Sequence, residues 1–184
     1  MKKPETPEVI KNILWETGGN WESDNIKTRL KDLEVNINDI DLVLCSHGHS
    51  DHIGCLSLFP NSFISVGHDI SVKNKFRKPN DTKPTPGDIL LHLKNSDVDI
   101  KLVTTPGHTY GCTSLILSGQ ISFQNKICSK VVLAGDLWEN ENDKDSFSDF
   151  SENSEVQKIS REYILTQKPD FIVPGHGPAF SLKK

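Results

Sequence analysis

Four side chains able to bind a metal ion lie within six residues of this chain, at His47, His49, Asp51 and His52. Imidazole and carboxylate groups at such short spacing suit a divalent transition metal such as zinc. The group directly follows an apolar stretch of strand length, residues 42–45. Polar, glycine-containing turns after strands are a common location for functional residues in α/β proteins. The motif therefore predicts a metal site at the end of this strand.

Three further residues of ligand type follow later apolar stretches, each on a turn that contains glycine or proline. They are His108, Asp136 and His176. Any one of these turns alone is weak support for a site, because many such turns bind nothing. Strand ends in one sheet are neighbours in space, so we expect the three residues to converge with the first motif.

The complete set resembles the signature of the metallo-β-lactamase superfamily, His-x-His-x-Asp-His followed by a His, an Asp and a final His. The resemblance extends from about residue 13 to residue 180. It implies that one metal is held by His47, His49 and His108. It implies that the second is held by Asp51, His52 and His176, with Asp136 as the bridging carboxylate. We therefore expect two zinc ions per chain, although the same donors also accept iron or manganese.

The resemblance also implies an α/β (α+β) fold, a four-layer αββα sandwich of two mixed sheets. We expect a single domain over residues 1–184. Members usually carry two or three strands before the strand that ends in Asp-Thr-Gly, whereas about a dozen residues precede it here. We therefore expect an N-terminally shortened domain that lacks its first strands. Glu16 stands where the family more often has Asp, and we expect it to brace the ligand loop at a longer reach.

Turns 105–109 and 173–178 resemble the glyoxalase II branch, and residues 46–60 resemble the metallo-β-lactamase domain-containing proteins more closely still. This closer resemblance implies an endoribonuclease that hydrolyses phosphodiester bonds in histone pre-mRNA 3′-end processing. A paired metal site makes a hydroxide nucleophile near neutral pH, and Asp51 is best placed to orient it and accept its proton. The alternatives are a glyoxalase II-like thioester hydrolase, a mononuclear iron persulfide dioxygenase and a non-catalytic shortened isoform.

Composition limits the location and the partners of the protein. No apolar run approaches 18 residues, so no membrane span is expected, and residues 1–5 do not begin a secretory signal. The four cysteines are scattered, which favours free thiols in a reducing compartment. We expect the cytosol, with the nucleus as a second location. The net charge of −4 argues mildly against an RNA substrate, and residues 73–83 contain the one local basic cluster. Family resemblance implies a homodimer.

Periodicity predicts the elements that position these residues. Strands are expected at 12–17, 42–45, 63–66, 89–93, 100–103, 113–117, 131–133 and 171–173, with a long loop over 73–87. A helix over 21–33 should face inward through Ile26, Leu30 and Leu33. A short helix is expected over 51–58. A helix over 155–166 should face inward through Val156, Ile159 and Tyr163.

Overall fold

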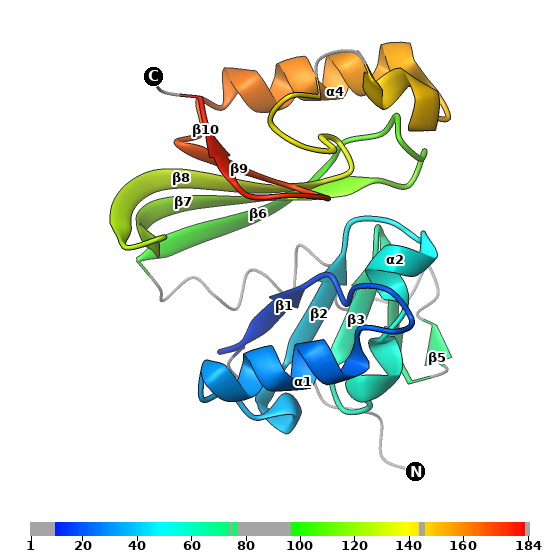
Figure 1. Ribbon diagram of the computed structural model, residues 1–184, viewed down its shortest axis with the longest axis vertical. Helices are drawn as coiled ribbons and strands as arrows, with labels where there is room; N and C mark the ends of the chain where they lie inside the picture. Colours follow the sequence, from blue (N-terminus) through cyan, green and yellow to red (C-terminus); the bar gives the residue numbers. More distant parts are fainter. Residues whose placement is uncertain (1–9, 74, 77–96, 144–145, 183–184) are drawn as a thin grey trace. The chain divides into compact units, whose positions relative to one another are not determined.

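The computed structural model describes residues 10–73, 75–76, 97–143 and 146–182, which form two five-stranded β-sheets. The chain divides into two compact units, Met1–Leu93 and Lys94–Lys184, and each contains one sheet with its own helices (Figure 1). Both sheets contain parallel and antiparallel pairs, which confirms the prediction of two mixed sheets. The expectation that both units belong to one domain stays a prediction.

The first sheet has the strand order β1-β2-β3-β4-β5. Its strands are β1 (Ile13–Trp15), β2 (Leu42–Cys45), β3 (Phe63–Val66), β4 (Asp69–Val72) and β5 (Lys75–Phe76). Strand β2 pairs in parallel with both β1 and β3. All four of its side chains are almost fully buried, so both faces of the strand are covered. A strand covered on both faces has a continuous apolar sequence rather than an alternating one, and this explains why residues 42–45 read as one apolar run.

The described residues of the first unit contain the helices α1 (Ser23–Asp32) and α2 (Ser50–Ile53) and the 3-10 segments η1 (Ile37–Asp39) and η2 (Leu56–Leu58). Helix α1 packs on the core through Leu30, and Ile26 is partly buried there, as predicted. The prediction for Leu33 was wrong, because its side chain is 71% exposed. The helix ends one residue earlier, so helical spacing no longer directs Leu33 towards the sheet. The single helix expected over 51–58 is divided into α2 and η2.

The second sheet has the strand order β10-β9-β8-β7-β6. Its strands are β6 (Val98–Thr104), β7 (Thr113–Phe123), β8 (Lys126–Gly135), β9 (Phe171–Pro174) and β10 (Phe180–Ser181). Strands β7 and β8 are much longer than predicted because they form one hairpin around Gln124 and Asn125. Both turn residues have positive φ, 48° and 60°, as the commonest two-residue hairpin turn requires. The predicted strand 89–93, and most of the predicted loop 73–87, lie outside the described residues.

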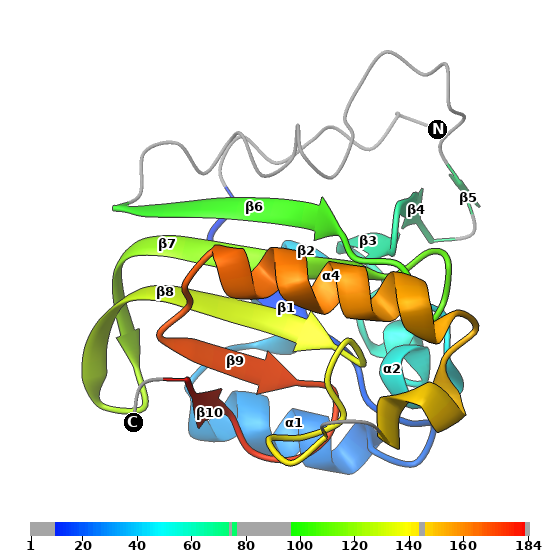
Figure 2. The same ribbon diagram turned by 90° about the horizontal axis from the view of Figure 1, so that it is seen from above.

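Helix α4 (Ser154–Thr166) covers one face of the second sheet, and the 3-10 segment η3 (Ser146–Phe150) precedes it (Figures 1 and 2). Its predicted inner face was wrong, because Ile159 is 66% exposed and Tyr163 is 37% exposed. The buried side chains are instead Gln157, Ser160, Arg161 and Ile164. Three of these four are polar because much of this helix faces loop carbonyl groups, which need hydrogen-bond donors. Within the described ranges, no helix has the length and apolar character of a membrane-spanning segment.

Candidate metal centre

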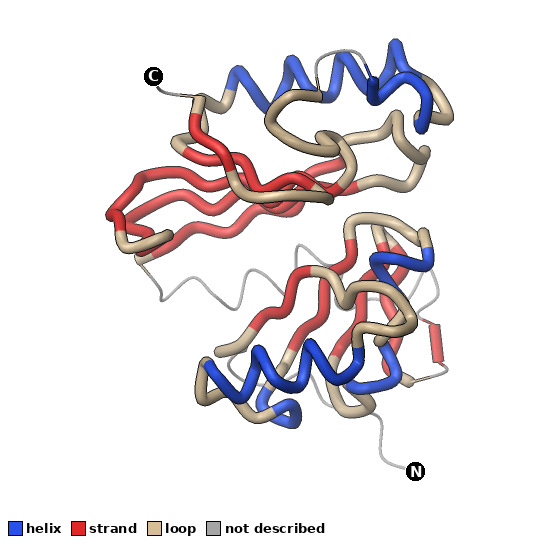
Figure 3. The backbone as a smooth tube through the Cα atoms, viewed as in Figure 1, coloured by secondary structure: helices blue, strands red, loops and turns tan. Residues whose placement is uncertain are grey.

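The seven predicted ligands all follow strands, but they follow strands of two different sheets. His47, His49, Asp51 and His52 lie between β2 and the end of α2, in the first unit. The other three, His108, Asp136 and His176, lie in the segments after β6, β8 and β9 of the second unit, which Figure 3 colours as loops and turns. The expectation of a common sheet was therefore wrong. Each unit brings its own ligand residues together.

In the first unit, the imidazole rings of His49 and His52 lie beside that of His47. Its ring centroid lies 4.4 Å from that of His49 and 4.3 Å from that of His52. His47 and His52 are buried, whereas His49 is exposed. The hydroxyl of Ser46 lies 2.8 Å from Nδ1 of His47, which orients the ring and leaves Nε2 as its ligand atom.

Glu16 braces this group from the end of β1, as the sequence predicted. Its Oε1 accepts a hydrogen bond from the Ser46 backbone N–H at 3.1 Å and lies 3.3 Å from Nδ1 of His52. The other ring nitrogen of His52, Nε2, faces Asp51 Oδ2 at 3.8 Å. Glu16 holds this position with φ of +64°, a conformation that non-glycine residues rarely adopt. Such strain persists where the surroundings over-determine the backbone, which is typical of functional sites.

Thr17 fixes the short helix α2 that carries Asp51 and His52. The Thr17 backbone N–H and hydroxyl both donate to the His52 carbonyl, at 2.8 and 3.0 Å. The Thr17 hydroxyl also accepts from the backbone N–H of Cys55, at 3.3 Å. A four-residue helix has little stability of its own, so these tertiary bonds determine its position.

In the second unit, two imidazoles face one oxygen of a buried carboxylate. Asp136 Oδ2 lies 3.4 Å from Nε2 of His108 and 3.6 Å from Nε2 of His176. Both distances exceed the 2.7–3.2 Å that is usual for an N–H···O bond. His108 and Asp136 are buried, and a buried carboxylate requires paired or metal-bound surroundings. The two histidine nitrogens and the Asp136 oxygen converge at distances slightly longer than those of hydrogen bonds, and such an arrangement fits ligands around a cation.

Glu139 is a candidate ligand that the sequence analysis missed. Asp136, Glu139 and His176 each offer a ligand atom, and these atoms lie within 4.8 Å of one another. Glu139 Oε2 is 3.8 Å from Nε2 of His176. The residue stands in an acidic stretch that resembles a solvated surface loop, and its only distinguishing signal is its position three residues after Asp136.

Gly175 makes room for the Asp136 carboxylate. A Cβ atom at this position would overlap Asp136 Oδ1 and would stand 2.9 Å from Cγ and 3.0 Å from the backbone N of the same residue. Two backbone bonds hold the two loops together, from the Gly175 N–H to the Trp138 carbonyl at 3.0 Å and from the His176 N–H to the Glu139 carbonyl at 3.2 Å. The glycine before His176 therefore permits the close approach of these loops.

The four cysteines are free and buried, in agreement with the expected free thiols. Burial raises the pKa of the Cys112 thiol above its ordinary value of 9.0. The Cys112 sulfur accepts a hydrogen bond from the Thr109 backbone N–H at 3.2 Å, which stabilises the turn after His108. Cys112 therefore supports the ligand loop as a protonated thiol, and its burial does not favour a nucleophilic role.

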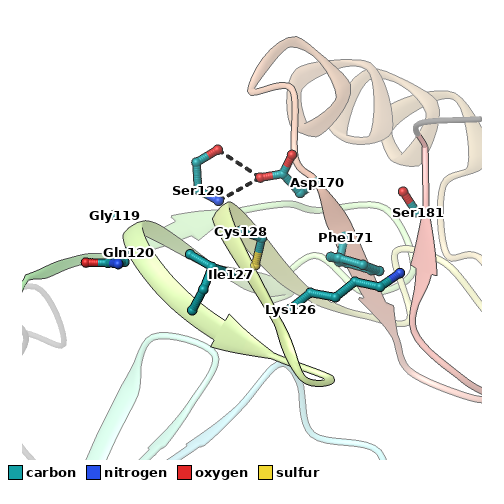
Figure 4. Close-up of a pocket in the computed structure, with 9 residues that line it drawn as sticks. All are labelled: Gly119, Gln120, Lys126, Ile127, Cys128, Ser129, Asp170, Phe171 and Ser181. Carbon is teal, nitrogen blue, oxygen red and sulfur yellow. Dashed lines mark hydrogen bonds between the residues drawn. The ribbon is translucent and has the colours of Figure 1, made fainter.

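A pocket of about 610 Å³ in the second unit lies away from the ligands (Figure 4). Its lining includes Lys126 and Ile127 at the start of β8, Phe171 at the start of β9, and Asp170 just before β9. Asp136 follows the opposite end of β8, and a ten-residue strand spans roughly 30 Å. Asp170 accepts bonds from the backbone N–H and hydroxyl of Ser129, which gives it a structural role at the hairpin base.

Comparisons with known proteins agree on one family. Its sequence profile, described as the Metallo-beta-lactamase superfamily, matches residues 10–176. Metallo-beta-lactamase domain-containing protein 1 of Xenopus laevis is 37% identical over 172 residues, which are 94% of this chain and 69% of that protein. The Homo sapiens protein of the same name is 34% identical over 175 residues, covering 91% of this chain and 59% of that protein. The chain thus spans about two thirds of the length of these relatives.

The fold has a counterpart among solved structures. The class B3 di-zinc metallo-beta-lactamase LRA-12 from an Alaskan soil metagenome aligns with a TM-score of 0.57 at 15% identity. The alignment covers 92% of this chain and 70% of that chain. A likeness at this level of identity shows a common fold.

Proposed function

This chain belongs to the metallo-β-lactamase superfamily, and we propose that it is a dinuclear zinc hydrolase that cleaves RNA. As a member of this superfamily it is a metal-dependent hydrolase with histidine and aspartate ligands for its metal. The observation that carries the proposal is the extent of the family match, because residues 10–176 include the ligand groups of both units. We propose that these groups serve one centre made of His47, His49, Asp51, His52, His108, Asp136 and His176.

The donor set fits zinc. Imidazole nitrogen and carboxylate oxygen are common zinc ligands, and Ser46 and Glu16 orient the rings of His47 and His52 as partners of metal-bound histidines do. When bound, two zinc ions supply an ionised water at neutral pH and a positive field for the anion that develops during hydrolysis. Asp136 would help to hold the metal together with His108 and His176, because its Oδ2 faces Nε2 of both histidines.

Asp51 is the proposed general base. Its side chain is about half exposed, and its Oδ2 lies beside His52. In the proposed reaction this oxygen orients the attacking water and accepts its proton. The water oxygen forms a bond to phosphorus, one ester P–O bond breaks, and the leaving ribose oxygen takes a proton from solvent. The first unit thus provides the proton acceptor, and Asp136 in the second unit provides the shared carboxylate.

An exposed aromatic ring that follows two exposed lysines in the chain supports RNA as the substrate. Phe76 on strand β5 is 71% exposed, and the neighbouring Lys73 and Lys75 are exposed as well. Base stacking on an aromatic side chain next to cationic groups is a common way to hold single-stranded RNA. The other residues of the basic cluster, Arg77, Lys78 and Lys83, lie outside the described residues. The resemblance of residues 46–60 to the metallo-β-lactamase domain-containing proteins, which implies an endoribonuclease, is the other reason for this choice.

The test begins with elemental analysis of the purified chain for zinc, iron and manganese. Two zinc ions per chain support the proposal, whereas one iron with oxygen uptake would favour the persulfide dioxygenase. Absence of bound metal would overturn the proposal. Single-stranded RNA that contains a histone pre-mRNA 3′ end is then incubated with the wild type and with Asp136→Ala. Cleavage that Asp136→Ala lacks supports the endoribonuclease. Phe76→Ala should weaken RNA binding by about 1–3 kcal/mol.

The thioester hydrolase is the second candidate, and the turn Thr105-Pro106-Gly107-His108 favours it through its resemblance to glyoxalase II. A glutathione thioester in the same assay separates the two candidates. Hydrolysis of the thioester without RNA cleavage would replace the endoribonuclease proposal.

We also propose a homodimer that acts in the cytosol and the nucleus. Light scattering of the purified chain and fractionation of cells test these two points. A monomer at micromolar concentration would contradict the first, and a secreted protein would contradict the second.

A further inference from the structure

Helix α4 contacts two of the ligand-bearing turns of the second unit. We propose that its inner side chains, Gln157, Ser160 and Arg161, are positioning residues that hold His108 and Asp136 in a metal-binding arrangement. This inference rests on the proposed metal-dependent function. It assigns a role to three buried polar residues that provide no ligand atom themselves.

Helix α4 and the two residues before it anchor the turn that carries His108. The Ser160 hydroxyl donates to the Pro106 carbonyl at 2.7 Å. Just before the helix, the backbone N–H of Glu152 donates to the His108 carbonyl at 3.0 Å, and that of Asn153 donates to the Gly107 carbonyl at 2.9 Å. Gly107 approaches the helix so closely that an added Cβ would overlap the backbone of Gln157. Three successive carbonyls of this turn are thereby fixed to one element.

The same helix anchors the loop that carries Asp136. Gln157 is fully buried, and its Nε2 donates to the carbonyls of Asp136 and Leu137 at 2.9 and 3.3 Å. One turn later, Arg161 Nε donates to the Leu137 carbonyl at 2.6 Å. The side-chain carbonyl of Gln157 accepts from the Ser151 hydroxyl, which orients the amide so that its NH₂ group faces the loop.

Arg161 extends the network to the candidate ligand Glu139. Its guanidinium forms a buried ion pair with Asp143 and donates to the Asp143 carbonyl at 2.9 Å. The Asp143 carboxylate accepts from the Glu139 backbone N–H at 2.9 Å. The guanidinium also lies 3.8 Å from the ring centroid of Phe147. Arg161 is therefore locked on several sides and cannot easily follow a displaced loop.

These contacts explain how two ligands that are distant in sequence keep a short separation. Positions 157, 160 and 161 share one face of a helix, because residues three and four apart lie side by side. The His108 turn and the Asp136 loop are thus both bonded to adjacent turns of one rigid element. We attribute the 3.4 Å between His108 Nε2 and Asp136 Oδ2 to this shared attachment.

The test measures zinc affinity by competition with a chromogenic chelator, on the full-length chain stripped of metal and reloaded. Gln157→Met keeps the length of the side chain and removes the donors to Asp136 and Leu137. We expect it to bind zinc about 10–100 times more weakly, as other variants of residues behind metal ligands do. Lys158→Gln, at the next and exposed position, should leave the affinity unchanged.

A second control separates positioning from general destabilisation. Ile164 is fully buried on α4 and belongs to the apolar core, so Ile164→Val should lower the melting temperature of the metal-free chain. It should not change zinc affinity, because its side chain makes no hydrogen bond to the ligand loops. If Gln157→Met does not fold, Ser160→Ala replaces it, because it removes only the bond to Pro106.

Each outcome decides the question. Weaker zinc binding in Gln157→Met or Ser160→Ala, with wild-type affinity in Ile164→Val, supports the positioning role. Equal affinity in all folded variants overturns it and leaves the hydrolase proposal standing. Loss of affinity in Ile164→Val to the same extent also overturns it, because the effect would then follow stability alone. A wild-type chain that binds no zinc overturns both proposals together.

Discussion

A single added methyl group at position 175 should strongly weaken metal binding. In the wild type, a Cβ at Gly175 would overlap Asp136 Oδ1 and would stand 2.9 Å from its Cγ, where an ordinary contact needs at least 3.4 Å. The Cγ atom must therefore move by at least about 0.5 Å, and the carboxylate oxygens must swing further. The backbone N of Asp136, 3.0 Å from the new atom, blocks part of the escape route.

The displacement acts on the oxygen that faces both His108 and His176. A misplacement on the order of 1 Å at a reacting group can lower a rate about 100-fold, so Gly175→Ala should lose at least that much hydrolytic activity. Overpacking a filled site typically costs about 1–3 kcal/mol of folding free energy, which a folded chain can tolerate. The expected variant is therefore folded, poor in zinc and nearly inactive.

The matched control is Gly111→Ala, in the turn just after His108. A Cβ at Gly111 meets no atom within 4 Å, so the same chemical change should be neutral there. Both variants are assayed for zinc content after dialysis, for hydrolysis of a chromogenic phosphodiester and for thermal unfolding. Full zinc content and wild-type activity in Gly175→Ala would refute the steric reasoning. Equal losses in both variants would show that the glycines matter for another reason.

Three further predictions concern the residues around the ligands. Glu16→Gln should weaken zinc binding about 10-fold in chelator competition, because the neutral amide no longer supports the charge of a metal-bound His52. The control Glu22→Gln, at an exposed position, should leave zinc binding unchanged. Arg161→Met should lower the free energy of unfolding by about 3–5 kcal/mol in urea titrations, because it leaves the buried Asp143 carboxylate without its cation. A loss of unfolding free energy smaller than that of a control substitution at an exposed residue would contradict this. Burial raises the pKa of Cys112 above 9.0, so the protonated thiol stabilises the fold fully below pH 9, and this stabilisation is lost as the pH rises further. Urea unfolding midpoints at pH 8 and pH 10 should therefore differ less in Cys112→Ala than in the wild type. Equal differences in the two proteins would exclude Cys112 as the cause.

Strands were predictable where burial determines their sequence. Strands β2 and β3 were predicted with the observed bounds, since each is a short apolar run between polar segments. The β7–β8 hairpin was underestimated because Gln124 and Asn125 are not among the strongest hairpin turn pairs, although both adopt positive φ. Its outer half is also partly exposed and polar, so apolar runs mark only the inner half.

Helix α4 shows why a correct helix can be assigned the wrong face. Apolar periodicity directed Ile159 and Tyr163 inward, although both are exposed. The rule assumes that a helix is buried against apolar side chains, whereas this helix is buried largely against carbonyl groups of the ligand loops. Gln157 and Arg161 resemble solvent-facing residues in any sequence pattern, because the partners that bury them come from distant segments.

The same distinction separates the two ligand groups. The first group was recognisable because four possible metal ligands within six residues form a local pattern, which is visible in the sequence itself. The second group depends on contacts across 20 residues or more, such as Gln157 to Asp136, and on Gly175, which contributes only the absence of a side chain. Metal ligands can therefore be predicted from residue types in the sequence. The residues that position those ligands cannot be predicted in this way. It follows that a search for loss-of-function substitutions limited to the seven ligands would miss Gly175 and Gln157, two positions where this structure predicts strong loss of metal binding.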